Sequence, residues 1–211
     1  MLIELQSIRP HPIPEKFIPE SDVWATDLVI ESGVKSLIAA QSGKGKSTLL
    51  HILYGLRNDF SGDALIDGHS VRKLTSSEWA IMRRTKTSIL FQDLKLFPQL
   101  NARDNILLVP EENSSAPSVD EMLHEVGMEE FVEQPVETLS FGQRQRIALL
   151  RALRKPFELL LLDEPFSHLD EENTSAACGL IEQIVGLNKA SLIISSLGDA
   201  PPISFDEKFR L

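Results

Sequence analysis

Cysteine is nearly absent from this sequence, which has only Cys178 among its 211 residues. A single cysteine cannot form an internal disulfide, so we expect a protein of a reducing compartment and interpret Cys178 as a packed residue. No apolar run approaches the roughly 18 residues that span a bilayer. The first residues also lack the basic and apolar regions of a signal peptide. If the protein works at a membrane, another molecule must hold it there.

Basic residues are the scarcer charge, with 21 Lys and Arg against 31 Asp and Glu and a net charge of −10. Binding to nucleic acid phosphates needs a basic face, so we expect no nucleic acid partner. The hydrophobic share of 42% and the charged share of 25% are those of ordinary globular proteins. A chain of this length can bury a substantial core without disulfides.

Apolar patterning predicts the order of strands and helices. The expected strands are residues 2–5 at a sheet edge, 23–30, 37–40, 63–68 with its turn, 88–91, 159–162 and 191–194. The expected helices are residues 77–84 after a Ser76 or Ser77 cap, pieces of 102–133, then 140–153 and 172–186, with a polar linker at 111–117. Strand–helix–strand order predicts an α/β sheet with right-handed crossovers. We expect no further domain after the last of these strands.

The most informative motif is the stretch Gln41–Thr48, which we call the phosphate loop. It joins an apolar run to a helical pattern, and at such a turn unpaired N–H groups and the helix dipole converge on an anion. We expect Lys46 to reach the β- and γ-phosphates and the Ser47 hydroxyl to bind Mg²⁺. The other residues expected to bind nucleotide are Gln41, Ser42, Gly43, Lys44, Gly45 and Thr48. A chance turn rich in glycine and serine is the alternative.

A second motif places Asp163 and Glu164 directly after four leucines, Leu159–Leu162. Continuous apolar runs are typical of strands covered on both faces, and an acid at the carboxyl end of such a strand points into the ligand crevice. We expect Asp163 to orient Mg²⁺ through water and Glu164 to polarise the attacking water as a general base. The alternative is a strand end with solvated carboxylates.

A third motif, Leu139–Gln143, opens the strongest helical pattern, and we call it the signature. Ser140 is a natural N-cap, and capping alone would explain it. The serine hydroxyl, the Gly142 backbone and the helix N-terminus would also bind an anion.

These motifs together resemble the nucleotide-binding subunit of ATP-binding cassette (ABC) transporters. In that family a phosphate loop, a glutamine after a buried strand, an LSGGQ signature, an acidic strand end and an SALD-like turn follow in this order. Here the last four are Gln92, Leu139–Gln143, Leu159–Glu164 and Ser167–Asp170, so the resemblance covers nearly the whole chain. It implies a single α/β domain: a P-loop NTPase core (1–92 and 144–211) with a mostly parallel sheet flanked by helices, N-terminal antiparallel strands, and an inserted helical subdomain at about 93–143.

The resemblance also implies a mechanism. Two such subunits, as a homodimer or with a second ABC subunit, sandwich ATP and Mg²⁺ between the phosphate loop of one and the signature of the other. Ser140, Gly142 and Gln143 then contact the γ-phosphate across the dimer, and Gln92 senses that phosphate and the metal. Asp170 bridges the two sites, and residues 93–98 meet a separate transmembrane permease at the cytoplasmic face of the membrane.

Three residues depart from the family pattern. Ala40 replaces the first loop glycine, which is tolerable where φ is negative, and Phe141 replaces the first signature glycine. Ser196 stands where the family has a histidine that contacts the γ-phosphate, and its hydroxyl lacks the reach and charge of an imidazole. We therefore expect slow hydrolysis. His168 is interpreted as structural, and Phe17 is the candidate aromatic for stacking on adenine.

The sequence thus predicts the ATP-hydrolysing subunit of a membrane transporter, driven by ATP-dependent dimerisation. Two other functions stay open: a soluble cassette ATPase acting on nucleic acid or another assembly, and an ATP-gated binding module with little hydrolysis. A transmembrane partner would distinguish the first alternative, and phosphate release the second.

Overall fold

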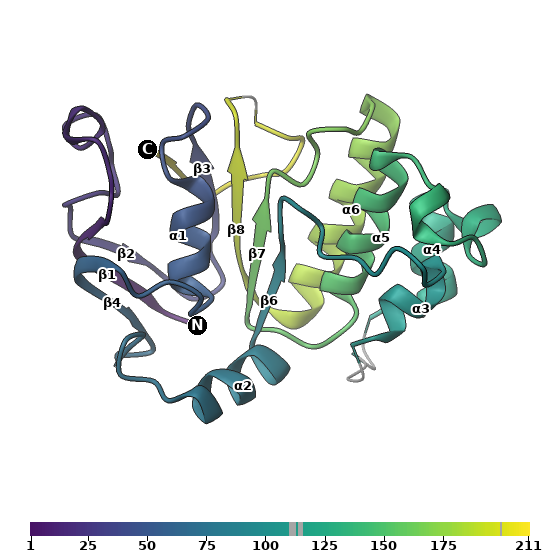
Figure 1. Cartoon of the computed structure of the whole chain (residues 1–211), viewed down its shortest axis with the longest axis horizontal. Coiled ribbons are helices and arrows are strands. Elements are labelled where there is room, and N and C mark those ends of the chain that lie inside the picture. The colour runs from purple at the N-terminus through teal and green to yellow at the C-terminus, as the bar shows by residue number, and fades with distance from the viewer. Residues whose placement is uncertain (110–112, 114–115, 199) are drawn as a thin grey trace.

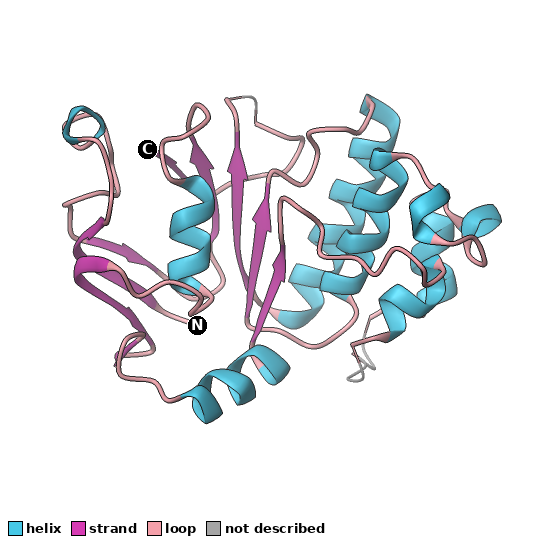
Figure 2. Cartoon of the chain, in the orientation of Figure 1, coloured by secondary structure: helices cyan, strands magenta, loops and turns pink. Residues whose placement is uncertain are grey.

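The computed structural model describes residues 1–109, 113, 116–198 and 200–211. These residues form two sheets (Figures 1 and 2). One is antiparallel, in the order β2 (Leu28–Ile30), β1 (Ile3–Pro10), β4 (Phe60–Ile66) and β5 (His69–Ser70). The other is wholly parallel, in the order β6 (Thr87–Leu90), β7 (Leu159–Asp163), β8 (Ser191–Ser196), β3 (Lys35–Ala39) and β9 (Glu207–Arg210).

Helices cover both faces of the parallel sheet. The helices of the described residues are α1 (Lys46–Leu53), α2 (Ser76–Thr85), α3 (Ala102–Leu107), α4 (Val119–Glu125), α5 (Phe141–Leu153) and α6 (Glu171–Asn188), with 3₁₀ turns at Glu15–Phe17, Glu129–Phe131 and Val136–Thr138; α3 and α4 pack on α5 and α6. Helix α1 lies between the two sheets, while α5 and α6 pack on the opposite face of the parallel sheet (Figure 1). The α/β architecture that the sequence predicts is therefore confirmed.

Strand β7 shows why the sequence needs four leucines in a row. Leu159 and Leu161 pack with α1 and the antiparallel sheet, whereas Leu160 and Leu162 pack with α5 and α6. All four are fully buried, because alternate side chains of a strand point to opposite faces. Because both faces of β7 are covered, its last residue, Asp163, is buried at the carboxyl end of the strand.

The predicted strand positions fail mainly at the two ends of the chain. The first strand is not at an edge: β1 runs to Pro10 and pairs with both β2 and β4. Residues 23–27 are not a strand, because Ala25 has a left-handed backbone (φ 58°) and Trp24 turns inward to be buried. Strand β9, which the sequence pattern did not predict, pairs in parallel with β3.

The predicted helix at residues 77–84 begins one residue earlier, and its cap is neither Ser76 nor Ser77. Thr75 is the N-cap, accepting a hydrogen bond from the Glu78 N–H while the Glu78 carboxylate accepts from Thr75. This reciprocal arrangement satisfies two backbone donors at once, so it outcompetes a simple serine cap.

Residues 93–143 contribute the short helices α3 and α4, and α3 packs against α5 (Figure 1). The boundary between a core and a helical subdomain remains a prediction. Residues 111, 112, 114 and 115 of the predicted linker lie outside the described residues. Within it, Asn113 is buried and its side chain donates to Asn188 (2.7 Å). Cys178 is buried in α6, and burial raises the pKa of its thiol to about 12, which fits a packed residue.

Candidate nucleotide site

The phosphate loop connects β3 to α1. Gly43 and Gly45 have left-handed backbones, with φ of 80° and 102°. Gly45 is the N-cap of α1 and provides no side-chain cap, so the first N–H groups of the helix are not bonded by a capping side chain. Ala40 does not have a left-handed backbone, so its methyl group costs no strain there. The loop is thus built as an anion cradle at a helix N-terminus.

The indole of Trp24 packs against this loop. Its indole Nε1 donates to the Lys44 carbonyl (3.1 Å), and a Cβ added at Gly45 would lie 2.9 Å from the indole ring. The sequence reasoning missed Trp24. The signal was available only as an aromatic residue in an otherwise proline-rich segment, and nothing local points it toward a loop 20 residues away.

Lys46 is almost entirely buried and turns back over the loop. Its Nζ donates to the carbonyl oxygens of Ala40 (2.9 Å) and Gln41 (3.3 Å) and lies 3.1 Å from Glu164 Oε1. Glu164 Oε2 accepts a hydrogen bond from Gln92 Nε2 (3.4 Å). Lysine, glutamine and glutamate, separated by up to 118 positions in the sequence (164 − 46), therefore meet at one point.

A cavity of about 200 Å³ opens at that point. It is lined by Gln92, Glu164 and six of the predicted loop residues, namely Ser42, Gly43, Gly45, Lys46, Ser47 and Thr48. Lys44 is not in this lining, and its Nζ pairs with Glu20 (3.2 Å) instead. The remaining loop residue, Gln41, contributes its carbonyl to Lys46.

Asp163 carries the feature that fits a metal. Its Oδ1 accepts a hydrogen bond from Ser195 Oγ (2.6 Å), while its Oδ2 is buried and has no hydrogen-bond partner among the described residues. Ser47, Gln92 and Asp163 also line one common cavity. The described residues contain no group of three or more His, Cys, Asp and Glu side chains suited to a metal. This donor set suits a cation that keeps several water ligands and also binds nucleotide phosphates, rather than one held by protein ligands alone.

The signature caps its helix by itself. Ser140 is the N-cap of α5, accepting from the Gln143 N–H (3.2 Å), and the Gln143 side chain accepts from the Ser140 N–H (2.8 Å). Gly142 lies against the next loop, because a Cβ there would be 2.7 Å from the His168 carbonyl. Within the described chain, Ser140, Gly142 and Gln143 do not line the cavities of the phosphate loop.

A sequence model of the family described as "ABC transporter" matches residues 25–167 of this chain. The chain belongs to the ABC transporter family. Its match spans the phosphate loop, Gln92, the signature and Glu164, which is the order on which the resemblance rested. The chain is accordingly an ATP-binding and ATP-hydrolysing subunit of the kind that powers membrane transport.

Named ABC proteins resemble most of the chain. The lipoprotein-releasing system ATP-binding protein LolD of Buchnera aphidicola is 37% identical over 174 residues, covering 80% of this chain and 76% of that protein. The thiamine import ATP-binding protein ThiQ of Vibrio vulnificus is 36% identical over 168 residues, covering 77% and 69%. Both similarities extend over more than two thirds of each protein.

Solved ABC structures share the fold. One is a dimeric post-hydrolysis state of the ATP-binding cassette MJ0796 bound to ADP and phosphate, with a TM-score of 0.75 and 25% identity over 93% of this chain and 88% of that one. Another dimeric structure of the same cassette gives a TM-score of 0.73 and 26% identity, covering 92% and 88%.

Two predicted residues of this ABC subunit lie beside the loop rather than in its cavity. Ser196 ends β8, where its carbonyl accepts from the Ala40 N–H (3.1 Å), and it lines a separate cavity of about 670 Å³ with Glu164. Phe17 lies with its ring 5.5 Å from the Lys44 ammonium. Both are therefore near the phosphate loop, on either side of it in sequence.

Gln145 is a site residue that the sequence reasoning missed. Its side chain is buried on α5, and its Nε2 donates to the Glu164 carbonyl (2.9 Å). A glutamine among the apolar positions of a helix is the signal that could have revealed it, because buried amides require partners.

Asp170, which the resemblance assigns to a bridge between two sites, is the N-cap of α6. The pKa of its carboxyl is lowered mainly by the hydrogen bond from the Asn173 N–H, then by the Asn173 side chain, with a smaller effect of Arg146. Asp170 therefore stays ionised, as a cap at the positive end of a helix should.

Proposed function

We propose that two copies of this chain, or one copy and a second ABC subunit, close around ATP and drive a separate membrane permease when ATP is hydrolysed. The observation that carries the proposal is the meeting of Lys46, Gln92 and Glu164 beside the phosphate loop. The dimeric form of the similar cassette, bound to ADP and phosphate, supports the pairing. A γ-phosphate that joins two surfaces favours the closed state, and its loss by hydrolysis removes that preference.

In this proposal the chain's own groups bind the phosphates, orient the attacking water and accept its proton. The loop N–H groups and the Lys46 ammonium hold the phosphates, and Ser140, Gly142 and Gln143 of the partner subunit complete the site. Gln92 orients the attacking water, and Glu164 accepts its proton on a carboxylate oxygen as general base. When bound, Mg²⁺ would neutralise charge on the phosphates. Ser47, Gln92 and Asp163 would hold it, since Oδ2 of Asp163 has no hydrogen-bond partner among the described residues.

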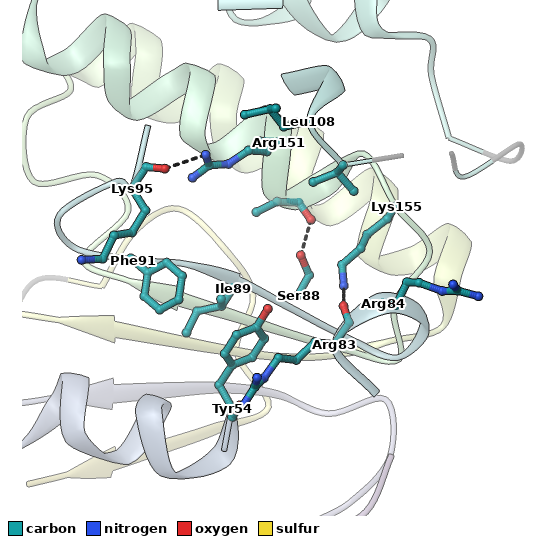
Figure 3. A pocket seen from close by; sticks show the side chains of 12 residues that line it. Tyr54, Arg83, Arg84, Ser88, Ile89, Phe91, Lys95, Leu108, Arg151 and Lys155 are labelled. Atoms are coloured by element: carbon teal, nitrogen blue, oxygen red, sulfur yellow. Dashed lines mark hydrogen bonds between the residues drawn. The ribbon is translucent and has the colours of Figure 1, made fainter. Parts of the chain in front are cut away.

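The proposed surface for the permease adjoins Gln92. A cavity of about 410 Å³ lies beside the segment that follows this residue, and it is lined by Tyr54, Phe91 and Lys95 together with basic residues (Figure 3). Arg151, in the lining of this cavity, donates to the Lys95 carbonyl (2.7 Å). Phe97, in the same segment, is 55% exposed. An exposed apolar side chain two residues along the chain from Lys95, which lines the basic cavity, suits a partner segment that carries apolar and acidic residues.

The proposed permease also determines where in the cell we expect this chain to work. No helix of the described residues is long and apolar enough to cross a bilayer. Of the similar proteins, LolD belongs to a lipoprotein-releasing system and ThiQ to thiamine import. We place this chain at the cytoplasmic face of a membrane, held there by its permease.

Sizing with ATP tests the sandwich. Glu164→Gln should bind ATP without turning it over and elute as a dimer, whereas the Glu164→Gln/Lys46→Met double variant should stay a monomer. A monomer in both cases would reject the sandwich. Phosphate release by the unaltered chain that is no faster than from Glu164→Gln would favour the ATP-gated module.

Recovery of the chain from membranes tests the partner. Phe97→Asp should lose co-purification of a multi-span protein while keeping its own ATP hydrolysis. Leu187→Asp, at the far end of α6 and 48% exposed, is the matched control. Nucleic acid recovered in place of a membrane protein would favour the soluble cassette.

A further inference from the structure

Phe141, one of the three departures from the family pattern, lies against His168 of the SALD-like turn. Phe141 occupies the first glycine position of the signature, and His168 occupies the alanine position of the SALD-like turn. Their ring centroids are 4.1 Å apart with planes at 49°. The Arg144 guanidinium lies 5.5 Å from the centroid of the same phenyl ring. Two large side chains in separate motifs thus form one contact.

The contact joins the start of α5 to the loop that follows β7. The two backbones are also close there, because a Cβ on Gly142 would lie 2.7 Å from the His168 carbonyl oxygen. Aromatic pairs in such tilted arrangements attract beyond the area that they bury. The stack therefore fixes how α5 sits on this loop.

A chain of hydrogen bonds continues from His168 to Glu164. His168 Nδ1 lies 2.8 Å from Ser167 Oγ, and that hydroxyl donates to the Glu164 carbonyl (3.2 Å). A serine hydroxyl has one proton. It can serve the Glu164 carbonyl and His168 together when Nδ1 carries the imidazole hydrogen. Gln145 donates to the same carbonyl (2.9 Å) from α5.

Glu164 needs this support because its backbone is left-handed, with φ of 49°. A side chain with a Cβ adopts that region only where its surroundings impose it. On the other side of the residue, the Glu164 N–H donates to Ser195 Oγ (3.0 Å). The direction of the carboxylate, toward Lys46 and Gln92, follows from this backbone.

We infer that Phe141 and His168 are a pair of positioning residues for Glu164, tying the signature helix to the backbone of the general base within the same subunit. The inference rests on the role of Glu164 in the proposed function. Each partner replaces a small residue of the family pattern, and each gains its function only with the other present.

A double-mutant cycle tests the pair. Phe141→Gly and His168→Ala should each lower kcat about fivefold with KM for ATP changed less than about twofold, because the carboxylate is misdirected while the phosphate loop is intact. The double variant restores the small residues of both motifs. Its kcat should be no lower than that of the worse single variant. Effects that multiply, or a change in KM alone, would overturn the inference.

Further variants separate the stack from the hydrogen bond. Phe141→Leu keeps an apolar side chain without the ring and should lower kcat as Phe141→Gly does, so the test does not depend on a glycine in the helix. His168→Asn retains a donor for Ser167 and should keep more activity than His168→Ala. His69→Ala, which removes an exposed histidine whose Nδ1 lies 2.9 Å from the Asp67 carbonyl of the same turn, is the control and should match the unaltered chain.

Glu164→Gln belongs in the same series. If it hydrolyses ATP as fast as the unaltered chain, the role of Glu164 in the proposed function is wrong. If it is inactive while the effects at Phe141 and His168 multiply, the proposed function stands and the pair is wrong.

Discussion

In the proposed dimer, the N-terminus of α1 in one subunit and the N-terminus of α5 in its partner hold the same γ-phosphate. The two termini are nevertheless built differently. Helix α1 starts after Gly45, which offers no side chain to its first N–H groups. Helix α5 starts after Ser140, whose reciprocal bonds with Gln143 already satisfy two donors. The first terminus is prepared for a ligand. The second is stabilised by its own residues, and an anion arriving there must share or displace its cap.

The neighbours of the two termini differ in the same sense. Lys46 is buried at the first and reaches Glu164, while Phe141 at the second is 36% exposed and lies on His168. We therefore predict that ATP binding depends on the first terminus alone, and that closure of the proposed dimer depends on the surface that the signature presents. Variants that affect one terminus without the other can test this division.

The largest effect is expected at Glu164, whose carboxylate lies 3.1 Å from Lys46 at the first terminus. Glu164→Gln keeps the shape of the side chain but loses the proposed general base, a group that typically contributes about 10²–10⁴-fold in rate. We expect phosphate release to fall by at least about 100-fold, while ATP binding, measured by calorimetry, changes little. Glu172→Gln, in the first turn of α6, is the control. Normal turnover by Glu164→Gln would move the chemistry elsewhere.

Gly45→Ala should break the first terminus. Its φ of 102° is strained for any residue with a Cβ, and the added methyl would lie 2.9 Å from Trp24. Left-handed strain alone costs about 1–2 kcal/mol, so we expect a loss of stability of that size and at least a tenfold loss of ATP affinity.

Gly179→Ala is the matched control for that change. It lies in α6 with nothing within 4 Å of the added Cβ, and alanine there should stabilise the helix by up to about 1 kcal/mol. Urea unfolding and ATP titration of both variants measure the difference. Equal ATP affinity in the two variants would show that the loop adapts to a side chain at Gly45.

Sequence reasoning predicts the first terminus well because its signals are local. The phosphate loop needs glycines at defined positions, and the strand before Asp163 needs apolar residues on both faces, as β7 shows. Such requirements appear as patterns within a few residues. The order of the motifs indicates the ABC transporter family, and the match to the family model confirms it.

The contacts that reached the site from a distance were not predictable in this way. The apolar pattern predicts a strand at Trp24, yet its indole donates to the Lys44 carbonyl of the loop, and Gln145 donates to a carbonyl 19 positions away. The stack of Phe141 on His168 joins two motifs that lie apart in the sequence. Pairings of this kind depend on the packed structure, and no periodicity in one segment records them.

Ser140→Ala tests the second terminus. Removing the cap should cost about 1 kcal/mol of stability, and it removes the hydroxyl proposed to meet the phosphate of the partner subunit. We expect a several-fold loss of ATP-dependent dimer, measured by sedimentation, with ATP affinity of the monomer unchanged.

Ser118→Ala is a close control, because Ser118 and Glu121 form the same reciprocal cap on α4. It should lose similar stability and keep its dimer. Equal dimer loss in both variants would mean that Ser140 acts only as a cap.

The smallest effect is expected at Ser196, which lies beside the first terminus and bonds the Ala40 N–H through its carbonyl. That bond is made by the backbone, so Ser196→His should preserve it and add an imidazole with the reach and charge that a hydroxyl lacks. We expect phosphate release equal to the parent or up to a few times faster, with Ser61→His on β4 as the control. A loss beyond about tenfold would give the Ser196 hydroxyl a role of its own. The first terminus would then have its own adaptation, as the second has in Phe141 and His168.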